Sequence, residues 1–131
     1  AAIGGVIAWA LAVPAGAGDP AVDYMLECQG CHLPDGAGAN DVPDLRDGIG
    51  RFIEVDGGRA YLVRVPGSSQ SALDDADLAE VLNWMIRAFG PAEVAASFQH
   101  FDAEEVARFR TVPLVEVDAV RRTLVERMVA D

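Results

Sequence analysis

Two cysteines and a histidine, spaced as CQGCH at residues 28–32, constrain this chain more than any other feature. Cys28 and Cys31 are the only two cysteines, and they lie too close together to link distant parts of a fold by a disulfide. The C-x-x-C-H spacing places two thiols within reach of the two vinyl groups of one haem, and it positions the imidazole of His32 to bind the iron. The motif therefore predicts one covalently attached haem c, enclosed by the rest of the chain.

Closely spaced cysteines also serve two other chemistries. A thiol–disulfide centre uses a C-x-x-C pair at the start of a helix, usually after a β-strand. Here the pair follows a predicted helix, and no strand is predicted before it. A zinc site needs four ligands, and His100 is the only histidine besides His32. The sequence therefore favours haem attachment over both alternatives.

The charge balance limits the partners of this chain. Ten arginines and no lysine face twenty-one acidic residues, which gives a formal net charge of −11. Such a surface repels phosphate backbones, and this excludes nucleic acid as a partner. The same surface attracts positive charge, so we expect a redox partner protein with a basic docking patch.

The first part of the chain has the composition of a targeting segment. Residues 1–18 contain no ionisable side chain, and small residues follow the apolar run at Ala15-Gly16-Ala17. We expect residues 1–17 to be the remnant of a signal peptide, which predicts an exported, periplasmic protein of a bacterium. The apolar run is shorter than the roughly 20 residues of a membrane span, so membrane association is expected only if this segment stays uncleaved.

The remaining residues are predicted to form an all-α domain. Asp19 and Pro20 indicate a helix start, and Val22, Met25 and Leu26 predict one apolar face on the helix that leads into Cys28. Residues 33–50 are rich in Gly, Pro, Asp and Asn, and we expect them to form a loop.

Further helices are predicted along the rest of the chain. Residues 59–65 favour a brief helix, and the clearest helix runs from a capping Asp74 to Gly90 with one apolar stripe. Asp102 and Asp118 are expected to cap two more helices. No alternation long enough for a β-sheet occurs in the sequence.

With these elements in this order, the chain resembles the small, monohaem class I c-type cytochromes. The resemblance rests on a helix that ends in YMLECQGCH, the loop LPDGAGANDVPDL and the helix LAEVLNWMIRAF. It implies a cytochrome c-like helical fold in which the first and last core helices cross. It also implies an electron carrier and not an enzyme. The match covers residues 18–90, so residues 91–131 are expected to be a helical extension packed on or beside the haem domain.

The sixth iron ligand is where the sequence departs from that family. The resemblance implies a methionine in the loop before the last core helix, but the loop at residues 65–73 contains none. Met85 is the nearest candidate by position, although its place on an apolar stripe also suits core packing. Met25, His100 and Met128 are further candidates, and an open distal face is the remaining alternative.

The expected function follows from which of these alternatives holds. Met ligation favours electron transfer, whereas an open site favours a haem enzyme or a gas-binding sensor. A third alternative is a haem subunit of a larger complex, with residues 91–131 as its docking arm. Arg59 and Arg64 are candidates to pair with the haem propionates, because the guanidinium fork suits carboxylates.

Overall fold

The computed structural model describes residues 18–46 and 48–130, and within them all regular secondary structure is helical. The elements are α1 (Pro20–Glu27), α2 (Gln29–His32), α3 (Ile49–Phe52), α4 (Gly58–Arg64), α5 (Pro66–Ser69), α6 (Asp75–Phe89), α7 (Ala92–Ala95), α8 (Ala103–Arg110) and α9 (Val117–Ala130). The predicted all-α, cytochrome c-like class is therefore confirmed.

Aspartate side chains begin three of these helices, as predicted. The Asp19 carboxylate accepts a hydrogen bond from the Ala21 amide at the start of α1 (2.9 Å). Asp74 and Asp102 do the same three residues further on, at the starts of α6 and α8 (both 2.8 Å). Each carboxylate satisfies an amide that the helix leaves unpaired, and it faces the positive end of the helix dipole.

The apolar face predicted for the first helix is wrong. Val22, Met25 and Leu26 are 43%, 50% and 70% exposed, and the buried side chain of α1 is Tyr24. The Tyr24 ring packs against the ring of Trp84 on α6, with 5.1 Å between centroids. Aromatic contact between the two helices, and not an aliphatic stripe, therefore holds α1 in place.

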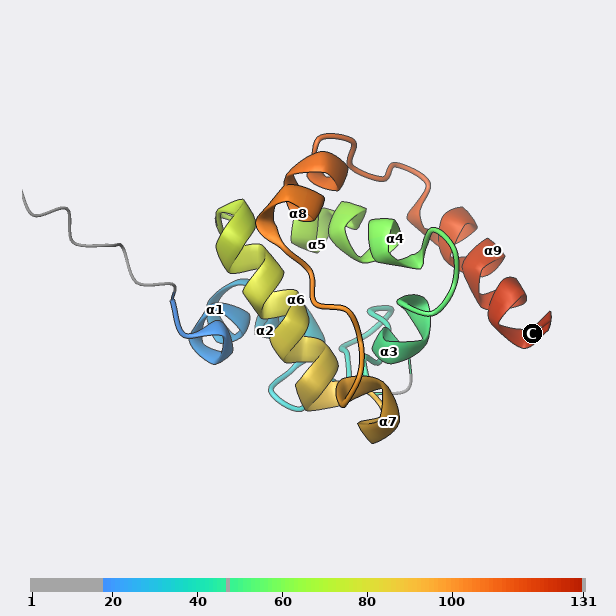
Figure 1. Cartoon of the computed structure of the whole chain (residues 1–131), viewed down its shortest axis with the longest axis horizontal. Coiled ribbons are helices and arrows are strands. Elements are labelled where there is room, and N and C mark those ends of the chain that lie inside the picture. The colour runs from blue at the N-terminus through green and yellow to red at the C-terminus, as the bar shows by residue number, and fades with distance from the viewer. Residues whose placement is uncertain (1–17, 47, 131) are drawn as a thin grey trace, which may run out of the picture.

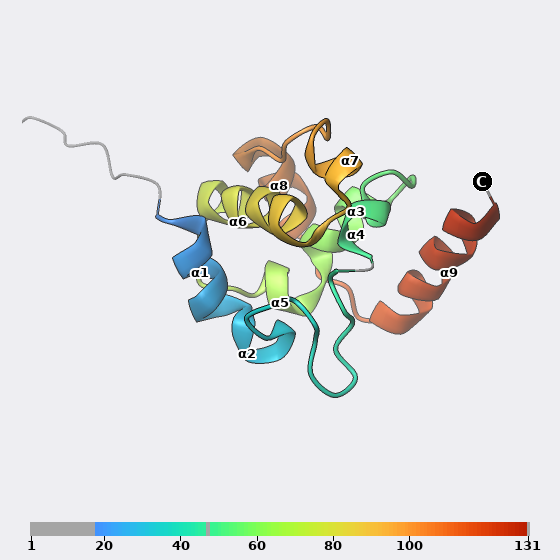
Figure 2. The same ribbon diagram turned by 90° about the horizontal axis from the view of Figure 1, so that it is seen from below.

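Helix α6 is the central element of the molecule. It packs against α1, α3, α7 and α8, so the first and last core helices are in contact as the resemblance implies. Figures 1 and 2 show α1 and α9 at opposite ends of the molecule, with α6 and α4 between them. The hydrophobic core extends beyond residue 90, because Val94, Phe101 and Val106 are buried in the same cluster as the residues of α6.

The last helix is joined to the core through α4. The Leu114 amide donates to the Arg64 carbonyl (2.9 Å), and α9 then packs along α4. The prediction that Asp118 caps this helix is wrong by one residue, since α9 begins at Val117 and Asp118 lies in its first turn. The Glu116 carbonyl accepts from the Val120 amide at this start, and the Asp118 carboxylate still lies near the positive end of the dipole.

No helix in residues 18–46 and 48–130 is long and apolar enough to cross a membrane. The predicted signal peptide remnant, residues 1–17, lies outside the described residues.

Candidate functional site

The CQGCH motif forms a turn that gathers its three reactive side chains. Cys28 ends α1, and its carbonyl accepts hydrogen bonds from the Cys31 amide (3.2 Å) and the His32 amide (3.0 Å). Cys28 is partly buried and Cys31 is exposed. Both sulfur-bearing residues and His32 line the same cavity.

The loop predicted after the motif folds back onto it. The Gly38 amide donates to the His32 carbonyl (3.1 Å), and the Ala39 amide donates to the Cys31 carbonyl (2.9 Å). Gly38 has a φ of +77°, and a Cβ there would lie 2.3 Å from the Val42 carbonyl oxygen. Only glycine fits this position without strain, so the glycine-rich composition of the loop has a structural cause.

Tyr24 fixes the other side of the same turn. Its hydroxyl donates a 2.6 Å hydrogen bond to the carbonyl of Leu33, the residue after the motif. Burial, reinforced by Cys28 and Asp35, raises the pKa of Tyr24 to about 12, so the phenol stays protonated and can donate at neutral pH. The helix α1, the motif and the loop are thereby held as one unit.

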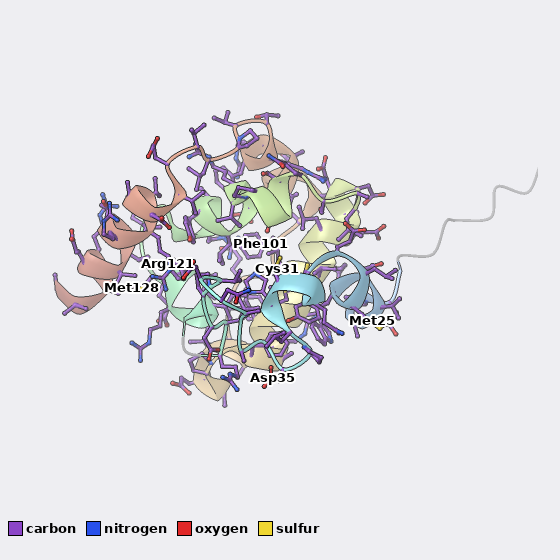
Figure 3. The ribbon with its side chains drawn as sticks, turned by 180° about the vertical axis from the view of Figure 1, so that it is seen from behind. Met25, Cys31, Asp35, Phe101, Arg121 and Met128 are labelled. Carbon is purple, nitrogen blue, oxygen red and sulfur yellow. The ribbon has the colours of Figure 1, made fainter. Side chains whose placement is uncertain are left out.

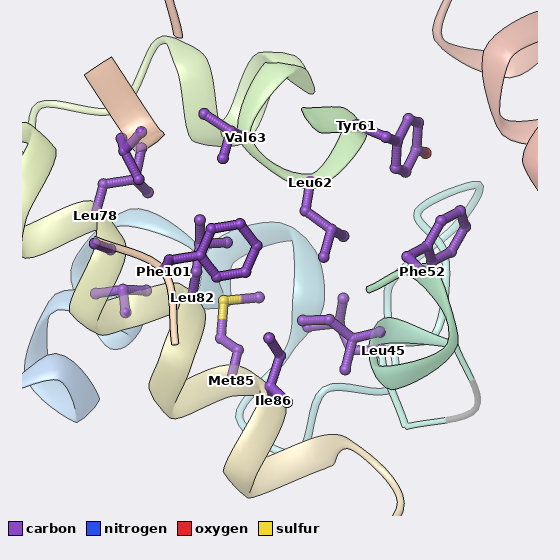
Figure 4. Packing of buried hydrophobic residues seen from close by; sticks show 14 of the residues in the cluster. Leu45, Phe52, Tyr61, Leu62, Val63, Leu78, Leu82, Met85, Ile86 and Phe101 are labelled. Carbon is purple, nitrogen blue, oxygen red and sulfur yellow. The ribbon is translucent and has the colours of Figure 1, made fainter. Parts of the chain in front are cut away.

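The cavity beside the motif is large and mainly apolar. Its volume is about 370 Å³, within the range of cavities that hold ligands and cofactors. Apolar side chains from α3, α4 and α6 form most of its wall: Ile49, Phe52, Tyr61, Leu62, Leu78, Val81, Leu82 and Met85. Figure 4 shows Met85 pointing from α6 toward Leu45 and Leu62.

Two polar atoms of this cavity are buried without a partner. His32 Nδ1 and Arg121 Nε make no hydrogen bond of regular geometry to any residue that the structure describes. Burial lowers the pKa of His32, and an interaction with the Pro43 backbone partly opposes that shift. The imidazole is therefore neutral at neutral pH, which is the form that binds a metal.

The thiol–disulfide alternative does not fit the electrostatics of the site. Burial, followed by the charges of Glu27, Asp23 and Cys31, raises the pKa of Cys28 to about 11. Redox-active cysteines have a lowered pKa, because the thiolate is the attacking species. The zinc alternative fails as well, since no group of three or more His, Cys, Asp or Glu side chains suited to a metal occurs in the described part of the chain.

Comparison with known proteins decides the family. No family model matches the sequence. A curated relative, cytochrome c-552 of Thermus thermophilus, is 32% identical over 119 residues, which cover 75% of this chain and 91% of the relative. A second cytochrome c-552, from another record of the same species, has the same identity and is covered over 80% of its length. The chain belongs to the c-type cytochrome family.

The cofactor of a c-type cytochrome is covalently bound haem c, and the cavity of this cytochrome fits that group. A flat apolar macrocycle requires apolar walls, which α3, α4 and α6 provide. The iron requires a neutral imidazole, which His32 provides, and the carboxylates of the macrocycle require a cation or donor, such as the unpartnered Arg121 Nε. The thin supply of aromatic residues in the sequence, 7%, is consistent with a core completed by the cofactor.

The structure separates the four candidates for the sixth ligand of this cytochrome. Met85 is 6% exposed and lines the cavity together with His32. Met25 is half exposed on α1, and Met128 packs against the edge of the core on α9. The His100 ring is exposed and contacts the Phe98 ring, 4.8 Å between centroids, so none of these three lines the cavity.

Sequence reasoning missed the contribution of the C-terminal extension to the cavity. Val117, Asp118 and Arg121 of α9 line it, whereas Arg59 and Arg64 are occupied elsewhere. Arg59 forms an ion pair with Glu105, and Arg64 Nε donates to the Val112 carbonyl (2.6 Å). The pattern of α9 gave no signal for this, because only one of its residues, Leu124, is fully buried.

Figure 3 shows Cys31 on α2 and Arg121 beside α9, apart from one another across the view.

Proposed function

We propose that Cys28 and Cys31 form the two thioether bonds to one haem and that His32 is the proximal iron ligand. The observation that carries this proposal is the placement of all three side chains on the wall of one apolar cavity. When bound, a haem c supplies a one-electron ferric–ferrous couple. The function that this site supports best is an electron carrier, which takes one electron from a donor and passes one electron to an acceptor.

The surface around the motif suits transfer to a protein partner. Cys31 is exposed and Cys28 is partly buried, so the attachment edge of the cavity lies at the molecular surface. Glu27, Asp41 and Asp44 line the same cavity and give this region negative charge. We infer that the partner presents a basic docking patch to these carboxylates, because complementary charge increases the rate of encounter.

We also propose that the protein acts outside the cytoplasm, in the periplasm, and that haem is attached after export. The uncharged composition of residues 1–17 supports this proposal. The electron donor and acceptor would then be periplasmic proteins, such as a dehydrogenase and a terminal oxidant.

For the sixth ligand we propose Met85. Its support is that Met85 alone of the four candidates shares the cavity with His32. The opposing observation is at Gly67, in the loop where the family has methionine: Gly67 lines the cavity, and a Cβ there would meet no atom of the described chain within 4 Å. That open space favours the second candidate function, a haem protein whose distal face takes an external ligand.

Absorption spectra of the purified holoprotein distinguish the two. We expect the ferric charge-transfer band that marks a methionine–iron bond in the wild type and in His100→Ala, and its loss in Met85→Leu, which keeps the side-chain volume. A high-spin wild-type spectrum that changes when carbon monoxide is added to the ferrous protein would contradict Met85 ligation. It would support the open-site function instead.

A further inference from the structure

Arg121 has an unusual position for an arginine in this chain. It extends from α9 to the wall of the haem cavity, where its Nε is buried and finds no hydrogen-bond partner among the described residues. Its Cζ lies 6.0 Å from the centroid of the Phe52 ring, a contact that orients the guanidinium without satisfying its donors. A buried donor left unpaired costs roughly 1 to 3 kcal/mol, so a partner missing from the protein itself is expected.

The charges that face the cavity show what kind of partner is needed. Four carboxylates line it, from Glu27, Asp41, Asp44 and Asp118, and Arg121 is the only arginine among the described lining residues. A haem brings two further carboxylates, its propionates, into this acidic surrounding. Without a cation nearby, that addition is unfavourable, because like charges repel and burial removes the solvent that screens them.

The covalent attachment determines where the propionates lie. In a haem, the vinyl groups and the propionates occupy opposite edges of the macrocycle. Thioether bonds at Cys28 and Cys31 hold the vinyl edge at α2, so the propionates face the part of the cavity away from α2. Arg121 enters from α9, which lies at the other end of the molecule from α1 and the motif it leads into (Figures 1 and 2).

Other arginines near the cavity already have their donors in use. Arg110 donates to the carbonyls of Ser69, Ser71 and Leu73 and pairs with Asp75. Arg59 and Arg64 bind Glu105 and the Val112 carbonyl, as described above.

We propose that Arg121 binds a haem propionate and that the C-terminal extension therefore forms part of the haem site. The guanidinium fork matches a carboxylate with two parallel hydrogen bonds, and Nε is one of the donors in that fork. The proposal assigns a cofactor-binding role to residues beyond position 90, and it rests on the proposed attachment at Cys28 and Cys31.

The test compares three variants of the holoprotein. Arg121→Gln removes the charge and the fork, Arg121→Lys keeps the charge alone, and Arg122→Gln removes the same charge from the exposed neighbouring position on α9. The readouts are the midpoint potential at neutral pH and low salt, and the propionate bending bands in the resonance Raman spectrum.

We expect Arg121→Gln to lower the midpoint potential, because a positive charge near the iron favours the ferrous state. Its propionate band should shift as well. Arg121→Lys should keep most of the potential but shift the band, and Arg122→Gln should leave the band unchanged and alter the potential less.

Equal potentials and unchanged bands in Arg121→Gln and Arg122→Gln would overturn the proposal. If Arg121→Gln does not accumulate as holoprotein, the band in Arg121→Lys decides, and an unchanged band rejects the contact. Extraction of the haem from denatured wild type would instead contradict the attachment at Cys28 and Cys31, and the two failures are thus distinguishable.

Discussion

At the scale of single residues, Asn83 shows how the extension is attached to the core. It is 1% exposed, on the face of α6 that also carries Leu82 and Met85. Its Oδ1 accepts from the Phe101 amide (2.7 Å), and its Nδ2 donates to the Phe101 carbonyl (3.0 Å). One side chain thereby satisfies both backbone groups of a residue in the segment before α8.

Asn83→Ala should lower the free energy of unfolding of the holoprotein by about 2 to 4 kcal/mol. The change leaves the Phe101 amide and carbonyl buried without partners and also creates a small cavity. Glu80→Ala, at an exposed position of the same helix, is the control and should change the stability by no more than about 0.5 kcal/mol. Guanidinium denaturation measures both, and equal losses would contradict this role of Asn83.

Residues differ in how well the sequence predicts them. Cys28, Cys31 and His32 form a local motif whose spacing alone indicates the cofactor. Asn83 and Arg121 act through partners that are distant in the sequence or absent from it, namely Phe101 and the proposed propionate. A polar residue in an apolar stripe, or an arginine in a polar helix, gives no sign of such a partner, so both were missed.

At the scale of elements, the loop between α2 and α3 does the most to shape the site. It returns to the motif through the hydrogen bonds of Gly38 and Ala39, and the Leu45 amide donates to the Gly36 carbonyl (2.8 Å). Leu33 and Asn40 also have positive φ angles, 61° and 54°. The path of this loop therefore depends on backbone conformations that glycine adopts most easily.

Gly38→Ala should destabilise the holoprotein by at least about 1 kcal/mol, because alanine disfavours a positive φ. Its Cβ would also lie 2.3 Å from the Val42 carbonyl oxygen, so the loop must shift. Gly30→Ala is the matched control, since a Cβ there meets no atom of the described residues within 4 Å. Thermal unfolding of the two variants checks this, and similar melting temperatures would contradict it.

The helix starts were predictable because an aspartate cap and the residues after it form a local signal. Asp19, Asp74 and Asp102 each accept the hydrogen bond expected of them. The buried face of α1 was not predictable, since Tyr24 is selected by Trp84 and Phe89, more than sixty residues away in the sequence. Tertiary contact overrides local apolar periodicity in such a short helix.

At the scale of the whole molecule, one hydrophobic core joins the segments on both sides of residue 90. Phe101, Val106, Leu114 and Leu124 are buried in the same cluster as Leu78 and Ile86. The division into a haem domain at 18–90 and an extension at 91–131 stays a prediction. The shared core indicates that the extension contributes to the stability of the site as well as to its lining.

The net charge of −11 should govern the rate of electron transfer with charged reagents. Oxidation of the ferrous protein by a cationic cobalt(III) complex should slow as ionic strength rises, because salt screens the attraction. Oxidation by ferricyanide, an anion, should accelerate under the same conditions. Stopped-flow rates that do not change with salt for either oxidant would contradict electrostatic steering.

The most direct test of the central claim is the mass of the denatured protein after expression in a bacterium that attaches haem c. The wild type should carry the mass of one haem that denaturant and acidified butanone do not remove. The Cys28→Ala/Cys31→Ala double variant should carry none, and His100→Ala should match the wild type. A wild-type chain that loses its haem on denaturation, or a double variant that keeps it, would contradict covalent attachment at the CQGCH motif.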